Sequence, residues 1–465
     1  MSWKKNIAIY MVLISWLSSC DFGNTNLDPT TLPDVEIPVI LPSALAQTAR
    51  NISSIGARVT GSVIQHFKGI EGQTESYSVY LIDENTIDEF WRTGLYSAAM
   101  RDCHTIIEKS EAVDAPHYSG IAKILMAMNL GIATTFWGDV PFQDAFVSNN
   151  FKPSYDTQEE IYEHIQSLLD QAIEDLSGPP GALRPDQTDL IFGGDASAWT
   201  ATARALKARY YLHLSKRHTE AAVDALNALD AGAEMTDENV PWFPYGNSQN
   251  EANTFAFFGD DRANQLALGD YLFTLMNAYG DPRLTKYAVR ENNDYLVYQR
   301  NNRDLFWTQF ESPLPLISYT EILFIKAECN LRIGNLAQAD AFLQQAIASN
   351  MNLMSIADYS AYQVSIGDLF DQPTYEDQLE FIMEQKYVAL FSQGTLESWV
   401  DYRRTGYPRL DPAADANESF NPSKVVPRRY LYPISERNAN LENMTQAIER
   451  QGGHLLDQDL WAFRN

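Results

Sequence analysis

The sequence predicts an all-α, mainly helical protein. Residues 161–176 carry apolar side chains at the three- and four-residue spacing of one helix face. Two Ala-rich stretches, 203–229 and 321–347, each predict a helix, a break of a few residues and a second helix. When the two stretches are aligned, Ala208 falls on Ala327, and small residues at such positions let paired helices approach closely. These stretches therefore predict helix pairs that stack on one another.

Capping and breaking signals give the elements in chain order. An extended segment with four prolines ends at Pro42, and Ser43 is expected to cap a first helix that ends near Phe67. Gly138 and Pro141 stop a helix over residues 121–136, because Gly permits a turn and Pro blocks a further helical turn. The helices expected besides these and the two pairs span residues 87–109, 154–176, 263–279, 356–370 and 375–391.

Two long segments break the helical pattern. Residues 232–262 and 287–318 are rich in Asn, Gln, Gly, Pro and aromatic residues and have no sustained helical period. Loops of this length inside a compact domain are uncommon and usually carry function. We therefore expect the functional site in these two segments.

The N-terminal residues have the layout of an export signal. A cationic start at Lys4 and Lys5 precedes an apolar run over residues 7–17, which is too short to span a bilayer. Small residues then lead to Cys20, a pattern similar to the lipobox of bacterial lipoproteins. We expect residues 1–19 to be a signal peptide and Cys20 to be lipidated. An ordinary cleaved signal with an incidental cysteine is the alternative.

The mature chain is expected to contain a tether and one domain. Residues 20–42 would form an extended, lipid-anchored tether, since their prolines make the segment semi-rigid. Residues 43–465 would form a single helical domain that carries the two loop insertions. No charge block or low-complexity tract divides this part of the sequence.

Composition excludes several functions. The chain has 61 acidic and 34 basic residues and a net charge of −27, which repels nucleic acid. With 7 histidines and neither a CxxC nor an HExxH motif, it gives no reason to expect a metal site or another cofactor. Cys103 and Cys329 lie in apolar helical stretches and are expected to be buried free thiols. A disulfide between them is the alternative in an exported protein.

A series of motifs covers almost the whole chain. The motifs are the lipobox with CDFGNTNLDPT, then TFWGDVPFQDAF, ALKARYYLHL, YGDPRL, SYTEILFIKAECNLRIGN, IMEQKYVALFSQGTLESWVDYRRTGYPRL and VPRRYLYPISERNANLENM. Together, and in this order, they resemble the SusD/RagB family of outer-membrane lipoproteins of Bacteroidetes. The spacing around YLIDENTIDEFWRTGLY is most similar to the SusD-like subgroup with the shorter middle region.

The resemblance implies a fold and a function. The fold would be SusD-like, with four tetratricopeptide-like helix pairs as a scaffold and long loops as the ligand-binding face. The protein would be a lipid-anchored outer-membrane protein on the cell surface that binds oligosaccharides and delivers them to a SusC-type TonB-dependent transporter. Members of the family are not enzymes. Peptide capture on the same scaffold, as in RagB-like proteins, is the alternative.

Two of the motifs have a structural interpretation. Asp139 follows the helix stop at Gly138 and can accept backbone hydrogen bonds there. An Arg fork against Asp401, formed by Arg403 and Arg404 with Trp399 packed beneath, would fix the C-terminal segment to the scaffold. A ligand role for either arginine is the alternative.

Sugar binding requires flat aromatic faces, which pack on the C–H groups of pyranose rings, and planar polar groups for the hydroxyls. The two long segments supply both. For any single ring, packing inside the loop is the alternative. The stacking candidates are Trp242, Phe243, Tyr245, Tyr295, Tyr298 and Trp307, the polar candidates are Asn247, Gln249, Asn292, Asn293, Gln299, Arg300 and Arg303, and weaker candidates are Tyr77 and Tyr80.

Two other functions are less well supported. A glycoside hydrolase needs two carboxylates roughly 5–10 Å apart across a cleft. With 61 acidic residues, the sequence marks no particular pair. A purely scaffolding repeat protein would not explain the many aromatic residues of the two loop segments.

Overall fold

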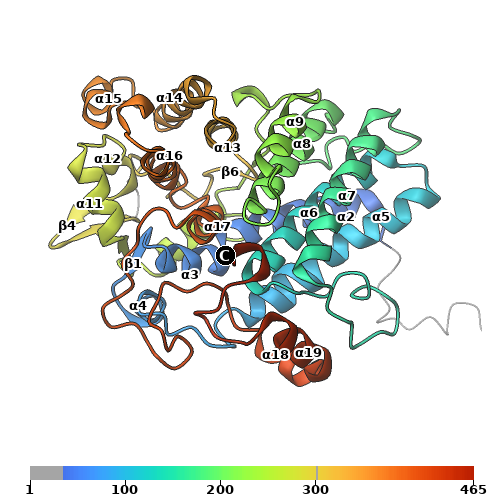
Figure 1. Cartoon of the computed structure of the whole chain (residues 1–465). Coiled ribbons are helices and arrows are strands. Elements are labelled where there is room, and N and C mark those ends of the chain that lie inside the picture. The colour runs from blue at the N-terminus through green and yellow to red at the C-terminus, as the bar shows by residue number, and fades with distance from the viewer. Residues whose placement is uncertain (1–34, 300–301, 465) are drawn as a thin grey trace, which may run out of the picture. The chain divides into compact units, whose positions relative to one another are not determined.

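The computed structural model describes residues 35–299 and 302–464, and most of their secondary structure is helical (Figure 1), which confirms the predicted fold class. The expected signal peptide, Cys20 and the tether up to residue 34 lie outside the described residues. Arg300 lies outside them as well.

Three helix pairs follow one another across Figure 1 in chain order. In each pair the second helix packs back on the first. Neighbouring pairs also contact each other, through α7 on α8 and through α9 on α13. The two Ala-rich stretches form the second and third pairs, as predicted, with Ala208 and Ala327 fully buried. The pairs are α6 (Pro116–Trp137) with α7 (Gln158–Ser177), α8 (Ala196–His213) with α9 (Ala221–Asp230), and α13 (Tyr319–Arg332) with α14 (Leu336–Leu353).

A fourth pair precedes these three. Helix α2 (Ile37–Ser53) packs on the continuous helix formed by η2 (Phe90–Met100) and α5 (Arg101–Ala112), and all three contact α6. The described part of the chain therefore contains the four helix pairs that the resemblance implies.

The start of α2 corrects the prediction for residues 37–42, which are helical rather than extended. Pro38 occupies the first turn, where a backbone N–H has no helical partner, so its ring is tolerated there. Pro42 lies inside the helix and removes one hydrogen bond, while the buried Leu41 and Leu45 hold this turn against its neighbours. The compact unit accordingly begins at Ile37, not at Ser43.

Helix α6 is long and apolar enough to cross a membrane, but 94% of its most apolar window is buried inside the protein. It is a core helix. Its end confirms the predicted stop: Gly138 has φ 83° and donates its N–H to the Thr134 carbonyl at 2.8 Å. Asp139 then accepts the backbone N–H of Gln158 at 3.0 Å, which joins the end of α6 to the start of α7.

Short antiparallel strands lie between the helices. β1 (Phe67–Gly69), β3 (Leu266–Leu268), β5 (Asp294–Leu296) and β4 (Val289–Glu291) form a four-stranded sheet in that order. β2 (Trp242–Phe243) pairs with β6 (Leu314–Pro315), so that Trp242 is opposite Pro315. The strands of the predicted loops are too short to give a period in the sequence.

The remaining helices differ from the predictions mainly at their ends. The first predicted helix is divided at Ser54 into α2 and a second helix. Helix α10 forms inside a segment predicted to be non-helical. The Asn253 side chain caps α10 by accepting hydrogen bonds from the N–H groups of Phe255 and Ala256. These helices are α3 (Ile55–Val63), α4 (Gly72–Ser78), η3 (Asp237–Asn239), α10 (Thr254–Asp261), α11 (Asp270–Ala278), α12 (Leu284–Tyr287), α15 (Ser360–Ile366), η4 (Leu369–Asp371), α16 (Tyr375–Ala389), α17 (Thr395–Thr405), α18 (Ile434–Ala439), α19 (Leu441–Gln451) and η5 (Trp461–Phe463).

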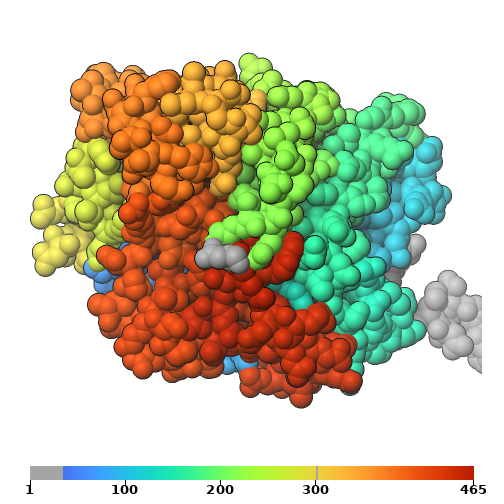
Figure 2. All heavy atoms as spheres, in the orientation of Figure 1, coloured from blue at the N-terminus to red at the C-terminus, as the bar shows by residue number. Residues whose placement is uncertain are grey.

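C-terminal residues, orange to red, cover much of the face shown in Figure 2. Buried indoles attach them to the scaffold: Trp137 donates to the Leu431 carbonyl and Trp399 to the Pro427 carbonyl, each at 2.8 Å. The Arg403 guanidinium lies 3.6 Å from the centre of the Trp399 ring. The predicted attachment of this segment is confirmed, although Arg403 contacts Trp399 rather than Asp401.

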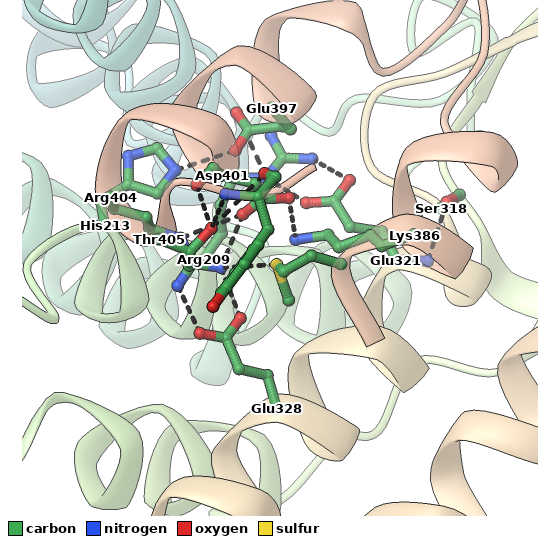
Figure 3. Close-up of polar contacts among 12 residues, drawn as sticks. Arg209, His213, Ser318, Glu321, Glu328, Lys386, Glu397, Asp401, Arg404 and Thr405 are labelled. Carbon is green, nitrogen blue, oxygen red and sulfur yellow. Dashed lines mark hydrogen bonds and ion pairs between the residues drawn. The ribbon is translucent and has the colours of Figure 1, made fainter. Parts of the chain in front are cut away.

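A buried charge cluster joins α8, α13, α16 and α17 (Figure 3). Arg404 bonds Asp401 at 2.6 Å and also Glu328, while Lys386 bonds the second oxygen of Asp401 at 2.8 Å. Each arginine and lysine of the cluster faces a carboxylate, so the cost of burial is offset at least in part by pairing. The cluster consists of Arg209, His213, Glu321, Glu328, Lys386, Glu397, Asp401 and Arg404.

Both described cysteines are free and buried, as expected. Cys103 lies in α5 and Cys329 in α13, next to Glu328 of the buried charge cluster. Burial raises the pKa of both thiols, which keeps them protonated at neutral pH.

Candidate ligand-binding site

A two-stranded ribbon places Trp242 at the protein surface. Successive side chains of a strand point to opposite faces, and here Phe243 is buried while Trp242 is half-buried. The pairing of β2 with β6 fixes this orientation, because Trp242 lies opposite Pro315 and Phe243 opposite Leu314. Trp242 is thereby half-buried beside the ends of two scaffold helices.

A pocket of about 320 Å³ lies beside this ring, and we call it the Trp242 pocket. Segments far apart in the sequence meet there: η3, β2, the start of α13 and the end of α14. Its walls combine an aromatic ring, a carboxylate, a phenol, a hydroxyl and an amide. The residues that supply them are Trp242, Asp237, Tyr319, Ser349 and Asn352.

The polar groups of the Trp242 pocket are only partly used by the protein. Ser349 is shared between the Thr320 hydroxyl at 2.9 Å and Asp237 at 3.4 Å, and the second of these is a long contact. The exposed Asn352 side chain makes no hydrogen bond with the described residues. The pocket therefore presents donors and acceptors that a ligand can take.

The electrostatics of the Trp242 pocket are acidic. Partial burial raises the pKa of Asp237, against a smaller lowering by the Ser349 hydroxyl. Burial, followed by the charges of Asp237 and Glu234, also raises the pKa of Tyr319. No Lys, Arg or His lines the pocket in the described part of the chain.

A smaller cavity of about 50 Å³ lies behind the pocket and shares Ser318, Thr320 and Leu353 with it. Trp307 lines this inner cavity and stacks on Trp242, with ring centroids 6.2 Å apart. The Trp307 indole N–H is buried without a hydrogen-bond partner among the described residues. Trp307 also has φ 68°, a conformation that costs energy for a bulky residue.

A second hollow of about 490 Å³, the Lys68 groove, differs in chemistry. Lys68 pairs with Asp270 at 3.1 Å, and Gln65 donates to the Asp411 carbonyl at 2.5 Å. The aromatic residues that line it, Phe67 and Tyr80, are buried, with 2% and 1% of their surface exposed. This groove combines charged and apolar side chains and offers no half-exposed aromatic ring from its described lining residues.

The structure brings only part of the predicted stacking residues together. Trp242, Phe243, Tyr245 and Trp307 gather at the β2–β6 ribbon, where the rings of Phe243 and Tyr245 lie 5.0 Å apart. Of these, Trp242 alone is half-exposed, whereas the other three are buried. Loop rings pack inward because a loop next to a large core buries apolar area in the same way as a helix.

The other predicted rings lie elsewhere. Tyr295 is half-buried on β5 and packs on Phe273, with ring centroids 4.4 Å apart. Tyr298 is buried and donates to Asp260 at 3.2 Å, and Tyr77 and Tyr80 are core residues. The exposed polar candidates are Asn247, Gln249, Asn292, Asn293, Gln299 and Arg303, none of which lines the Trp242 pocket.

Sequence reasoning missed most of the polar groups of the pocket. Ser349 and Asn352 lie at the end of a helix whose period identifies it as scaffold, and Tyr319 directly follows the N-cap residue of α13. Asp237 lies inside a predicted loop, in the capping sequence TDEN. The polar run SNMN at the end of α14 is the signal that could have directed attention there.

Comparisons with known proteins agree with the fold. A family model named SusD-like and described as starch-binding and associating with the outer membrane matches residues 30–433. No curated protein matches the chain.

Solved structures similar to the chain cover nearly all of it. A chitin-binding protein has 21% identity and a TM-score of 0.75, with 92% of this chain and 100% of that chain covered. A SusD/RagB family protein of Bacteroides thetaiotaomicron has 24% identity and a TM-score of 0.72, with 92% and 99% covered. A SusD homologue of Bacteroides uniformis has 21% identity and a TM-score of 0.75, also with 92% and 99% covered. At these identities the likeness establishes the fold, and it confirms the SusD-like prediction.

Proposed function

The chain belongs to the SusD-like family of outer-membrane-associated proteins, and on this premise we propose that it binds an oligosaccharide in the Trp242 pocket and delivers it to a SusC-type TonB-dependent transporter. The observation that supports this most is the half-buried Trp242 ring beside polar groups that the described residues use only in part. A pyranose ring fits such a site, since its C–H face packs on an indole while its hydroxyls reach carboxylate, amide and phenol groups.

The scaffold supports this role. The pocket is built on the ends of α13 and α14, which belong to the helix-pair scaffold, so Tyr319 and Asn352 are held by packed helices. Asp237, Val240 and Trp242 come from the segment between α9 and α10. A site that combines two fixed helix ends with three residues of one loop segment is suited to bind one class of sugar.

Binding without turnover is part of the proposal. Isothermal titration calorimetry of the full mature chain against a panel of oligosaccharides should detect one glycan class with micromolar or weaker affinity. Reducing-sugar release from any member would contradict it and favour a hydrolase. A panel without binding, together with peptide mixtures that do bind, would favour the RagB-like alternative.

The attachment to the outer membrane is proposed through lipid on Cys20. Cys20→Ala should leave ligand affinity intact and abolish retention on the cell surface, as measured by proteolysis of intact cells and by fractionation. Retention of the variant in the outer membrane would contradict lipid anchoring at this position.

The transporter partnership has its own test. The lipidated protein, extracted in mild detergent, should co-purify with a large β-barrel of the SusC type. Recovery of the protein alone, under conditions in which the barrel itself remains soluble, would contradict this part of the proposal.

A further inference from the structure

We propose that the Trp242 pocket accepts sugar units without negative charge, either neutral or amine-bearing, and that Asp237 sets this selectivity. The inference rests on the proposed function, because it concerns the same pocket. It adds the chemical class of the ligand and the residue that determines that class.

The first step is that Asp237 has no cation opposite it. Within the described residues its side-chain contact is the long one of 3.4 Å from the Ser349 hydroxyl. Lys326 of α13 is held by Glu234 at 2.6 Å and lies over the Phe342 ring. The carboxylate therefore faces the pocket with its charge uncompensated.

The second step concerns the ligand group that meets this carboxylate. A uronate or a sulfate would bring a second negative charge next to Asp237, and like charges that are partly withdrawn from water repel. A sugar hydroxyl can donate a hydrogen bond to the carboxylate, and an ammonium group can form a charge-assisted one. The pocket thus favours donors over anions.

The third step is that the charge of the rest of the chain also disfavours anionic ligands. The chain carries a net charge of −27, which repels anionic chains over distance. In the Lys68 groove the one basic residue among the described lining residues, Lys68, is paired with Asp270, and Asp411 and Asp415 line the same hollow. Neither of these two hollows offers a free cation from its described lining residues.

The test compares binding across a series of charges. The probes are fragments of neutral glucan, xylan, mannan and chitin, fragments of chitosan as the amine-bearing class, and oligogalacturonate and chondroitin sulfate fragments as the anionic class. The proteins are the mature chain, Asp237→Asn and Trp242→Ala. Glu238→Gln is the matched control, because Glu238 is the neighbouring exposed carboxylate and does not line the pocket.

We expect binding of a neutral or amine-bearing fragment that depends on Trp242. Asp237→Asn should weaken it about tenfold or more, because a hydrogen bond to a charged group is lost. Glu238→Gln should stay within about twofold of the unmodified chain. Thermal melting of each variant shows whether it is folded.

The outcomes distinguish the charge selectivity, the role of Asp237 and the proposed function from one another. Trp242-dependent binding of an anionic fragment would overturn the selectivity and leave the proposed function standing. Unchanged affinity in folded Asp237→Asn would overturn the role of Asp237. Absence of binding by every fragment would overturn the proposed function, and the selectivity would fall with it.

Discussion

The buried charge cluster and the Trp242 pocket use the same kinds of side chain in opposite ways. In the cluster, Glu328 is fully buried and bonds both Arg404 and Arg332. In the pocket, the one hydrogen-bond partner of the Asp237 side chain among the described residues is the Ser349 hydroxyl, 3.4 Å away. A charge that is paired inside the fold destabilises it when its partner is removed, whereas a carboxylate without a counter-charge is available to a ligand. The comparison predicts that changes in the two regions separate stability from binding.

The largest expected effect is on stability. Arg404→Met should lower the free energy of unfolding by about 3–5 kcal/mol, because it leaves Glu328 and Asp401 buried with fewer opposite charges. Urea denaturation measures the change. Sugar affinity per folded molecule should not change.

The matched control is Arg409→Met, which removes an exposed ion pair with Glu380. Its denaturation midpoint should equal that of the unmodified protein. If both variants shift the midpoint equally, the cluster has no special role in the scaffold.

The next effect is on binding. Trp242→Ala should weaken the affinity for the bound glycan by about tenfold or more, since the stacking surface is removed. Its midpoint of urea unfolding should fall less than that of Arg404→Met, because the half-buried ring loses its stack on Trp307 but leaves no buried charge unpaired. Phe151→Ala is the control, since that ring is 83% exposed and lies outside the pocket. Equal affinities of the two variants would remove Trp242 from the site.

A smaller effect is a pH dependence of stability. Burial opposes ionisation of Glu328, but Arg404 and Arg332 outweigh it and lower its pKa from 4.5 to about 2. Because the pKa of Glu328 is lower in the folded than in the unfolded protein, its ionised carboxylate contributes to the free energy of unfolding. This contribution is complete above pH 4.5 and is lost as the pH falls from 4.5 to about 2. Glu328→Gln should show a flatter decline of stability in this range. Parallel curves for the variant and the unmodified protein would contradict the paired state of Glu328.

The smallest expected signal comes from the thiols. Cys103 and Cys329 should not react with iodoacetamide in the native protein and should react in urea, since both are buried and their pKa is raised by burial. Mass spectrometry of the labelled peptides measures this. In Arg404→Met, Cys329 should be labelled faster than Cys103, because it lies next to the weakened cluster. Labelling of native Cys329 in the unmodified protein would show that the cluster region opens readily.

The scaffold could largely be predicted from the sequence because its signals are local. Helical period and helix stops identified the pairs and the break at Gly138. The contact between Arg404 and Asp401 could be predicted from the sequence because the two residues are one helical turn apart. The contact between Arg404 and Glu328 could not be predicted, since it depends on how packing places α13 and α17.

The site was less predictable because exposure is a tertiary property. Composition marks Trp242, Tyr298 and Trp307 alike, but strand pairing turns Trp242 toward the surface, whereas Tyr298 and Trp307 are buried. Asn352 is the opposite case, a residue of the pocket that the sequence does not mark as a candidate. Its helix has the period of a scaffold helix, and its position at the end of α14 places it in the pocket. The resemblance to a family did not supply these residues, because its motifs lie mainly in the scaffold.

The central claim is that the Trp242 pocket, and not another part of the surface, binds the ligand. The most direct test is hydroxyl-radical footprinting of the folded protein with the glycan that binds best in the panel. Oxidation of the Trp242 peptide, read by mass spectrometry, should fall several-fold at saturating glycan, while oxidation of Phe151 should not change. Protection at Lys68 and Asp411 with unchanged oxidation of Trp242 would place the ligand in the Lys68 groove and contradict the account.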